Sequence, residues 1–257
     1  MTKSSTTVPI SVFIITLNEE VNLNRALQSL TNIAEIIVVD SGSTDNTVAI
    51  AEKYGAKVYS QQWPGYAKQK QYAMSLCSNE WVLNIDADEV LNPDIITRFA
   101  AIIAQDKTDS VRFWRNDIFI GKKLSPLTKR ANNLRLYKKS KAHFDAHNLV
   151  HESAFVDGKE IFINNEFDHY GYNQISTLAS KNNHYSDLKA QEKYQQGKRY
   201  SVIKLFSIFP LIFIKEYFIQ RHIFSGIRGF IKSIMIAYYA FSKEAKLFEA
   251  EQLNKLK

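Results

Sequence analysis

The sequence predicts an α/β fold, in which a mainly parallel, Rossmann-like sheet is covered by helices and is followed by a helical, basic, amphipathic C-terminal segment. Two patterns lead to this prediction. Strand and helix signals alternate over the first 90 residues, and from about residue 175 the apolar spacing is helical to the end. A chain of 257 residues with 45% apolar and 23% charged side chains suits one large domain, or one domain with an appendage, and not a disordered polymer.

Four apolar runs of strand length occur in the first 90 residues, at 10–15, 36–39, 57–59 and 81–85. Between them, apolar residues recur at helical spacing and predict three helices, near residues 23–30, 47–53 and 66–78. Gly55 follows the second helix and is a plausible C-terminal stop. This alternating order predicts a parallel sheet that binds its ligands at the carboxyl ends of its strands.

Polar side chains follow three of these strands at the point where each strand ends. Thr16, Asn18 and Glu19 follow the first, Asp40 follows the second, and Asp86, Asp88 and Glu89 follow the fourth. Because the carboxyl ends of parallel strands meet at one edge of a sheet, we expect these residues to share one rim. Carboxylates crowded at such a place repel one another unless a cation compensates them.

The middle of the chain, from residue 94 to about 172, is less regular. Residues 111–115 and 134–137 are predicted strands with basic side chains, and a His- and acid-rich stretch follows at 144–152. Four basic residues between the two strands mark an exposed connection: Lys122, Lys123, Lys129 and Arg130. We place the end of the main domain at residue 195, so that residues 196–257 form a separate C-terminal segment.

All of the excess positive charge lies in the last quarter of the chain. From Lys198 onward there are 11 Lys and Arg against 4 Asp and Glu, whereas the preceding 197 residues hold 22 of each. The tail also contains two uncharged runs of ten residues, 205–214 and 233–242, with basic residues on either side. A spanning helix needs about 20 apolar residues, so we expect helices that lie in the interface of an anionic membrane. The alternative is that both runs pack on the protein core.

Other classes are less consistent with the sequence. No zinc-finger or RNA-binding signature accompanies the basic tail, so we expect no nucleic-acid partner. Cys77 is the lone cysteine, and the polar N-terminal segment lacks the apolar core of a signal peptide. We therefore expect a protein of the reducing cytoplasm.

The paired aspartates Asp86 and Asp88 suggest how a phosphate-bearing ligand is held. Neither G-x-G nor G-x-x-x-x-G-K-[ST] occurs among the nine glycines, which excludes the usual dinucleotide and P-loop fingerprints. Asp-x-Asp at a strand end instead offers hard oxygen ligands for Mg²⁺ or Mn²⁺, which in turn holds a diphosphate. Asp-x-Asp is also common in solvated turns, and this is the alternative for Asp88.

Several short motifs resemble inverting glycosyltransferases of family 2, which have the GT-A fold. They are Thr16-Leu-Asn-Glu-Glu20, Ile37-Val-Val-Asp40-Ser-Gly-Ser-Thr-Asp45, Gly65 with Lys70-Gln71, and Glu80-Trp81 with Asp86-Ala-Asp88. Farther along, Arg135-Leu-Tyr137, residues 150–152 and the aromatic, basic tail are similar to the lipopolysaccharide-core β-glucosyltransferase branch. Lys70-Gln71 departs from the Arg-Asn that is usual in the wider family.

The resemblance implies roles for the rim residues. It implies a nucleotide-sugar half at 1–92 and an acceptor half at 93–195, and the charge pattern of the tail predicts membrane attachment through 196–257. Asp40 would accept a hydrogen bond from the uracil imide, although a turn-forming or helix-capping role is its alternative. The remaining donor-site residues would be Thr16, Asn18 and Glu19 around the nucleoside, Lys70 at the ribose-diphosphate, Asp86 at the ribose or a metal-bound water, and Asp88 as metal ligand.

Inversion requires a base that takes the proton of the attacking acceptor hydroxyl. Glu152 is the preferred base, with Asp145 and Asp168 as rivals and a surface salt bridge as the alternative role for Glu152. His151 is a candidate late metal ligand, its alternative being a structural histidine. Four arginines could meet phosphates on an anionic acceptor or could protect strand edges by their charge: Arg112, Arg115, Arg130 and Arg135.

The resemblance, together with the basic tail, implies a peripheral glycosyltransferase on the cytoplasmic face of the inner membrane. It would use a divalent metal, Mg²⁺ or Mn²⁺, and a UDP-sugar donor. It would move a hexose, glucose being the expected one, to a lipid-linked acceptor such as the lipopolysaccharide or lipooligosaccharide inner core, with a β-linkage. Two alternatives are a nucleotidyltransferase, and a non-catalytic membrane-binding module that retains the fold.

Overall fold

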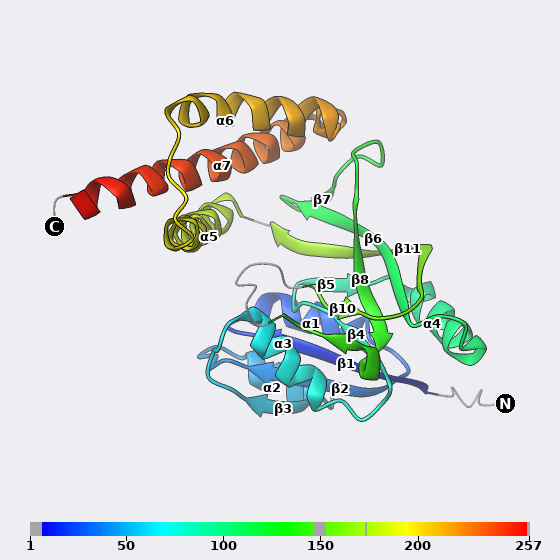
Figure 1. Ribbon diagram of the computed structural model, residues 1–257. Helices are drawn as coiled ribbons and strands as arrows, with labels where there is room; N and C mark the ends of the chain where they lie inside the picture. The colour runs from blue at the N-terminus through cyan, green and yellow to red at the C-terminus, as the bar shows by residue number, and fades with distance from the viewer. Residues whose placement is uncertain (1–6, 146–152, 173, 256–257) are drawn as a thin grey trace. The chain divides into compact units, whose positions relative to one another are not determined.

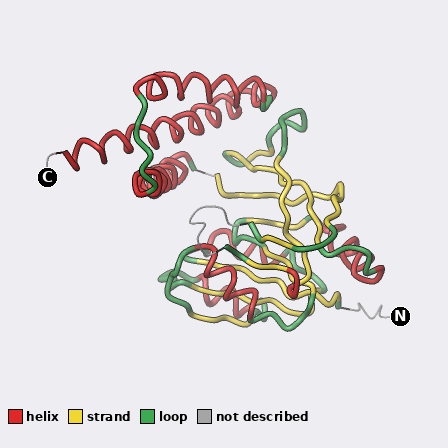
Figure 2. The backbone as a smooth tube through the Cα atoms, viewed as in Figure 1, coloured by secondary structure: helices red, strands yellow, loops and turns green. Residues whose placement is uncertain are grey.

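The computed structural model describes residues 7–145, 153–172 and 174–255, which form two compact units (Figures 1 and 2). The first unit comprises residues up to 116 together with 131–170. The second comprises 117–130 together with the chain from 171 onward. The predicted boundary at residue 195 lies inside this second unit.

A mixed sheet organises the first unit. Its strands lie in the order β3-β2-β1-β4-β8-β6-β11-β5, and β7 pairs with the far end of β6. β1 to β4 pair in parallel, whereas β8 pairs antiparallel with β4 and β6, and β11 pairs antiparallel with β5. The strands are β1 Val8–Thr16, β2 Ile33–Asp40, β3 Lys57–Ser60, β4 Trp81–Asn84, β5 Glu89–Leu91, β6 Ser110–Phe119, β7 Lys122–Lys123, β8 Ala131–Lys138 and β11 Glu160–Tyr172.

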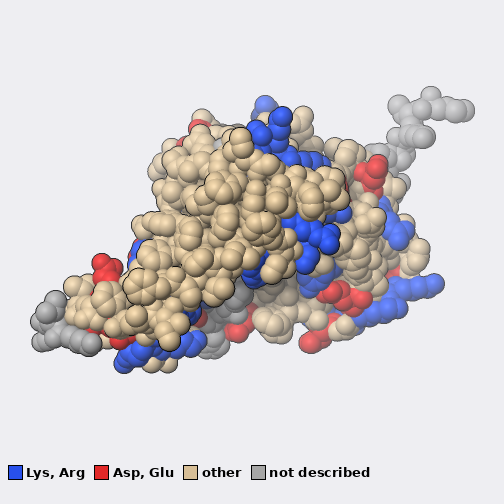
Figure 3. All heavy atoms as spheres, turned by 90° about the horizontal axis from the view of Figure 1, so that it is seen from above, with Lys and Arg blue, Asp and Glu red and all other residues tan. Residues whose placement is uncertain are grey.

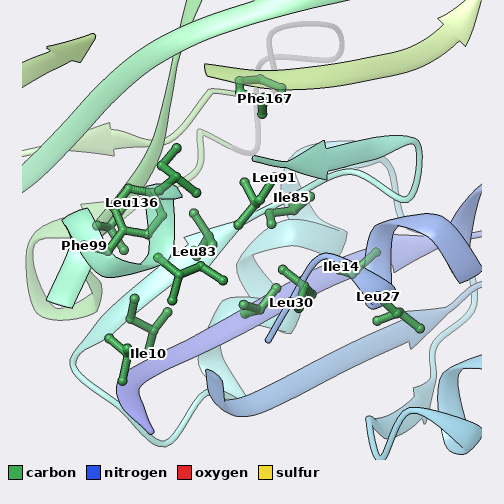
Figure 4. Packing of buried hydrophobic residues seen from close by; sticks show 14 of the residues in the cluster. Ile10, Ile14, Leu27, Leu30, Leu83, Ile85, Leu91, Phe99, Leu136 and Phe167 are labelled. Carbon is green, nitrogen blue, oxygen red and sulfur yellow. The ribbon is translucent and has the colours of Figure 1, made fainter. Parts of the chain in front are cut away.

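Helices cover both faces of the parallel half, as the strand alternation requires. Ile10, Val12 and Ile14 of β1 face one core, which α1, α2 and α4 cover, and Phe13 faces a second core under α3. Figure 4 shows Ile10, Leu83, Leu27, Phe99 and Phe167, which five different elements contribute to the first of these cores. The helices are α1 Glu20–Gln28, α2 Thr47–Lys53, α3 Tyr66–Ser75 and α4 Pro93–Gln105, and a short 3₁₀ turn (Lys139–Lys141) precedes the small hairpin of β9 Ala142–His143 and β10 Phe155–Val156.

The predicted α/β fold class is confirmed. The helix predicted at 47–53 has those bounds, and Gly55 follows it with φ +73°, the left-handed conformation of a helix stop. The predicted strands are each present, although the strand at 111–115 extends to Ser110–Phe119. The antiparallel pairing of β8 and β6 was beyond prediction, because register between strands distant in the chain depends on packing and not on local spacing.

The second unit is built mainly from three helices, α5 Ile175–Gln195, α6 Val202–Ile214 and α7 Gly226–Lys255. A π-helical turn (η2, Lys215–Ile219) and a 3₁₀ turn (η3, His222–Ser225) connect α6 to α7. Gly229 lies so near this connection that an added Cβ would stand 1.8 Å from the carbonyl oxygen of His222. The predicted helical C-terminal region is thus present, and no helix in the described ranges is long and apolar enough to cross a membrane.

The two uncharged runs of the tail have different environments. In the run at 233–242, Ser233, Ala237 and Ser242 are buried, and Asn182 of α5 donates to the carbonyl of Met235 at 3.2 Å. By contrast, α6, which contains the whole run at 205–214, buries none of its residues. Packing on other helices therefore buries one face of the second run, whereas no residue of the first run is buried, although Phe213 contacts Phe230 of α7.

Glu35 of β2 joins β1, β3 and the turn before β4. Its carboxylate accepts hydrogen bonds from Ser11 Oγ (2.5 Å), from both N–H and Oγ of Ser78 (2.7 and 2.8 Å), and from Lys57 Nζ (2.8 Å). Burial opposes ionisation, but Lys57, Ser11 and Ser78 outweigh it and lower the pKa of Glu35 to about 2. The charged form of Glu35 therefore stabilises the parallel half of the sheet.

This contribution to stability should be present above pH ~4.5 and should vanish as the pH falls toward 2, because the folded-state pKa is depressed. We expect Glu35→Gln to lower the free energy of unfolding by roughly 3 kcal/mol at pH 7, and by progressively less at pH 4 and pH 3. Urea unfolding of the full chain at these pH values measures the effect, with the exposed Glu52→Gln as control. A loss that is constant with pH would contradict the assignment.

Candidate active site at the carboxyl ends of the parallel strands

The register of the parallel strands brings the first two polar clusters together. Thr16 and Asp40, the last residues of β1 and β2, are paired positions. Beyond them the two loops interlock, since Asn18 N–H donates to Ser43 Oγ and Thr44 N–H donates to Asn18 Oδ1, both at 2.8 Å. Asn18 has φ +54°, a left-handed conformation that asparagine tolerates better than most residues. The predicted shared rim is thus present here.

Asp40 forms the turn that follows β2. Its Oδ2 accepts the N–H groups of Gly42 and Ser43, each at 2.8 Å, and its Oδ1 accepts Ser43 Oγ at 2.5 Å. These contacts correspond to the turn-forming alternative, and they leave Oδ1 with capacity for a further donor. Nearby on the same rim, Thr16 Oγ1 is buried and has no hydrogen-bond partner among the described residues. A buried hydroxyl in this condition is destabilising unless a ligand satisfies it.

Glu19 lies at the start of α1. Its N–H donates to Thr47 Oγ1 at 2.8 Å, and its carboxylate accepts Asn22 Nδ2 at 2.9 Å. Glu19 therefore connects the loop after β1 to α2 and helps to fix the mouth of the rim.

Asp86, just beyond β4, is held by two cations of the protein itself. Lys70 Nζ from α3 contacts Oδ1 at 2.9 Å, and Arg135 Nη2 from β8 contacts Oδ2 at 2.8 Å. The Lys70 side chain is only 1% exposed, although lysine is seldom buried unless it is paired. Burial would raise the pKa of Asp86, but Arg135 and Lys70 outweigh it and hold that pKa well below its usual range.

Glu89 shares the same arginine. Arg135 Nη2 also donates to Glu89 Oε1, and Glu89 Oε2 accepts the backbone N–H of Asp86 at 3.1 Å. Burial, opposed by Arg135 but reinforced by Asp86, raises the pKa of Glu89 to about 7. We call Lys70, Asp86, Glu89 and Arg135 the rim ion cluster. In this cluster, Lys70 and Arg135 provide much of the positive charge that the crowded carboxylates require.

Asp88 does not join the rim ion cluster, and its side chain lies near His169 of β11. Its Oδ2 lies 3.5 Å from His169 Nε2, and its carbonyl accepts the N–H of Tyr170 at 2.8 Å. The antiparallel pairing of β11 with β5, in which His169 lies opposite Glu89, produces this approach. No sequence spacing announces it, because the two residues are 81 positions apart and meet only through a strand pairing.

Asp88 and His169 fit a site for Mg²⁺ or Mn²⁺. Two adjacent ligands of an octahedral ion at ~2.1 Å lie about 3 Å apart, close to the separation of Oδ2 and Nε2 here. Within the described residues no group of three or more His, Cys, Asp or Glu is placed to hold a metal. Such an ion would therefore take its other ligands from water and a diphosphate, as Mg²⁺ commonly does.

The candidate bases are distributed differently. Asp168 of β11 is buried and accepts Asn116 Nδ2 at 3.3 Å, beside His169 in sequence. Asp145 is partly buried directly after Phe144, whose N–H donates to Gln71 Oε1 at 2.9 Å. Glu152 and His151 lie outside the described residues, so their predicted roles remain predictions.

The sequence-predicted residues thus fall into two groups. The loop residues Thr16, Asn18, Glu19 and Asp40 gather at the ends of β1 and β2, and Lys70 and Asp86 form a direct ion pair. Arg135 and His169 complete the arrangement, although the sequence did not indicate that Arg135 pairs with Asp86 and Glu89 or that His169 approaches Asp88. Arg135 is neither a solvated edge charge nor an exposed phosphate contact, because it is buried against Asp86 and Glu89.

Comparison with known proteins gives a consistent result. Residues 11–158 match the sequence model described as Glycosyl transferase family 2. An uncharacterized glycosyltransferase of Rickettsia conorii is 38% identical over 267 aligned residues, which cover 98% of this chain and 94% of that protein. The lipopolysaccharide core biosynthesis glycosyltransferase LpsC of Rhizobium meliloti is 35% identical over 258 residues, covering 96% and 94% respectively.

Among solved structures, S. aureus TarS matches with a TM-score of 0.50 over 93% of this chain. The match spans about half of the TarS chain (54%), and the identity is 16%. This likeness supports the GT-A fold and carries no inference about substrates.

Removal of the Arg135 guanidinium should destabilise the protein, because the rim ion cluster depends on it. We expect Arg135→Met to lower the free energy of unfolding by about 3–5 kcal/mol, because two crowded carboxylates lose their shared partner. The loss should be smaller at pH 6 than at pH 8, since protonated Glu89 needs no counter-charge.

Arg112→Met is the matched control, because Arg112 pairs with Glu160 on a half-exposed strand surface and should contribute no more than about 1 kcal/mol. Urea unfolding of both variants measures the difference. Equal losses in the two variants would show that the guanidinium does not hold the cluster together.

Proposed function

This chain belongs to glycosyl transferase family 2, and on that premise we propose that it transfers a hexose from a UDP-sugar, held with a divalent metal at the rim, to a lipid-linked saccharide acceptor. The family membership makes the protein a glycosyltransferase and agrees with the resemblance of its motifs. Donor, sugar, linkage and acceptor are our proposals. No observation favours the nucleotidyltransferase alternative.

The observation that carries the donor assignment is the separation of the carboxylates into two environments. The negative charge of Asp86 is already compensated by Lys70 and Arg135, whereas Asp88 lies next to His169, whose imidazole in its neutral form can serve as a nitrogen ligand. Asp88 is thus the carboxylate left to hold Mg²⁺ or Mn²⁺, with His169 as its partner. His151 stays a predicted metal ligand beside this proposal. Asp86 also keeps its predicted role at the ribose, because its side chain is partly exposed.

The interlocked loops support a nucleoside pocket. Asp40 Oδ1 retains capacity to accept the uracil imide N–H, and the buried Thr16 hydroxyl lacks a partner that a uracil or ribose oxygen could provide. Asn18 and Glu19 would shape the edge of this pocket, because their contacts fix the two loops to each other. A carboxylate that faces a base edge selects for the base that presents a donor.

The proposed reaction is a single displacement at the anomeric carbon. The acceptor oxygen forms the new glycosidic bond as the bond to the diphosphate breaks, and UDP leaves with the electron pair. A bound divalent ion would supply Lewis-acid stabilisation of that leaving group. Lys70 and Arg135 would keep Asp86 ionised and oriented, and a carboxylate on the acceptor side would take the hydroxyl proton.

The acceptor proposal follows from similarity. The protein named as a lipopolysaccharide core biosynthesis glycosyltransferase aligns with almost the full length of this chain. We infer an acceptor of the same class, a lipid-linked core saccharide, met by a peripheral enzyme at the cytoplasmic face of the membrane. Glucose as the transferred hexose and inversion to a β-linkage are the corresponding proposals for the reaction.

Calorimetric titration of UDP-glucose, with and without Mn²⁺, tests the donor site. We expect metal-dependent binding that weakens at least tenfold in Asp88→Asn and in His169→Ala, because each variant loses one ligand. Asp187→Asn, a change at an exposed ion pair in α5, is the control and should bind as wild type. Absence of UDP-glucose binding by wild type under both conditions would overturn the proposal, and unchanged binding in Asp88→Asn would exclude its metal role.

Three variants separate the candidate bases: Glu152→Gln, Asp145→Asn and Asp168→Asn. Loss of a general base should lower the rate of transfer by about 10²–10⁴-fold while leaving UDP-glucose binding intact. We expect this pattern for Glu152→Gln, measured as acceptor-dependent UDP release in single-turnover experiments. If all three variants stay within threefold of wild type, the base is another group.

A further inference from the structure

α6 is an apolar helix that is only half-buried on the side that contacts α7 and exposed on the other. Of its 13 residues only Lys204 is charged, yet none is buried. Ile203 is 82% exposed and Phe206 is 79% exposed. A helix that is apolar all round is normally enclosed by protein or lipid, so this helix requires a covering.

The apolar surface continues beyond α6 onto the connection to α7. Phe213 of α6 and Tyr217 of η2 both pack on Phe230 of α7, with ring centroids 5.7 and 5.8 Å apart, and this packing fixes the connection in place. Figure 3, which views the molecule from above, shows a broad area without charged side chains, with groups of Lys and Arg and several Asp and Glu around it. Large side chains stay exposed along the connection, namely Phe218, Ile219, Ile223, Phe224 and Ile227.

A distant loop adds cations to this surface. Ser125 N–H donates to Ser225 Oγ at 2.9 Å, and Lys129 N–H donates to the carbonyl of Gln220 at 3.0 Å, so residues 121–130 are attached to η3. This loop carries the exposed Lys122 and Lys129 within the same compact unit as α6 and α7. The loop lies about 100 positions before η3 in the chain, so the basic tail alone does not reveal its contribution.

The charged side chains of this surface are predominantly basic. The exposed Lys215 and Arg221 belong to the connection itself, and Glu216 is the only acidic residue between positions 198 and 243. Burial raises the pKa of Glu216 and opposes its negative charge. A second copy of the chain would bring like charges together in a self-complementary interface, which is unfavourable.

We propose that α6, η2, η3 and the first turn of α7, together with loop 121–130, form a surface that inserts shallowly into an anionic lipid bilayer. The apolar side chains would enter the interfacial region, while Lys122, Lys129, Lys215 and Arg221 meet lipid phosphates. With 13 residues α6 is about 20 Å long, less than the ~30 Å of a hydrocarbon core, so it lies along the interface. The inference deepens the proposed function by naming the partner surface on which a lipid-linked acceptor would be met.

Sedimentation with vesicles of phosphatidylcholine, with or without 30% phosphatidylglycerol, tests the surface in the full chain. We expect wild type to bind the anionic vesicles, and the double variant Ile203→Ser/Phe206→Ser to bind them at least about tenfold more weakly. Lys122→Glu/Lys129→Glu should weaken binding to anionic vesicles about tenfold or more, because it reverses two charges near the lipid surface. Val21→Ser, at an exposed apolar residue of α1, is the matched control and should bind as wild type.

UDP-glucose binding, measured on the same proteins, keeps this test separate from the donor site. All docking variants should bind UDP-glucose as wild type does, so failure of vesicle binding and failure of the donor assignment are distinguishable. Vesicle binding that is absent in wild type, or unchanged in both double variants, would overturn the proposal. A concentration-dependent dimer that Ile203→Ser/Phe206→Ser abolishes would identify a second copy as the occupant and would equally overturn it.

Discussion

The rim depends on the ion pairs that the guanidinium of Arg135 forms with Asp86 and Glu89. One nitrogen of this residue contacts both Asp86 and Glu89, and Lys70 binds the opposite oxygen of Asp86. These contacts join α3, the segment after β4, the start of β5 and β8, so the ion cluster fixes the carboxyl end of β4 where the sheet changes from parallel to antiparallel pairing. Without compensating charge the carboxylates of this segment would repel one another.

Satisfying the carboxylates internally has a chemical consequence for the site. A carboxylate that already has two cationic partners is ionised and oriented before any ligand arrives, which is the preorganisation that favours catalysis. Asp88, two residues farther on, lies outside this cluster and faces His169 of β11 instead. The short Asp-x-Asp segment thus presents one aspartate to the protein and the other to a candidate metal position.

In the second unit the main constraint is the exposed apolar surface of α6. The face of α7 with Ser233 and Ala237 is buried, whereas α6 contributes an apolar surface that no described segment encloses. An ion pair between Lys204 and the buried Glu244 at 2.9 Å, together with the Phe213–Phe230 contact, holds α6 on α7 in spite of that exposure. A rigidly held apolar surface with cations around it is suited to the interface of a membrane, where both kinds of group find partners.

The sequence by itself determined the alternation of strands and helices, the shared rim at the ends of β1, β2 and β4, and the family motifs, because each depends on residues close together in the chain. The periodicity of side chains and the chemistry of a strand end are local properties. Thr16, Asp40 and Asp86 could therefore be predicted as rim residues, whereas Lys70 was implied only by the resemblance of its motif to the family.

Tertiary structure alone decided which distant side chains complete that rim and that surface. Arg135 reaches Asp86 through the pairing of β8 with β4, His169 reaches Asp88 through the pairing of β11 with β5, and Lys129 reaches the tail through the docking of its loop on η3. Antiparallel register and loop docking depend on the packing of the whole domain, and no local spacing encodes them. The sequence therefore determined which residues could form the site, and the tertiary structure determined which distant residues contact them.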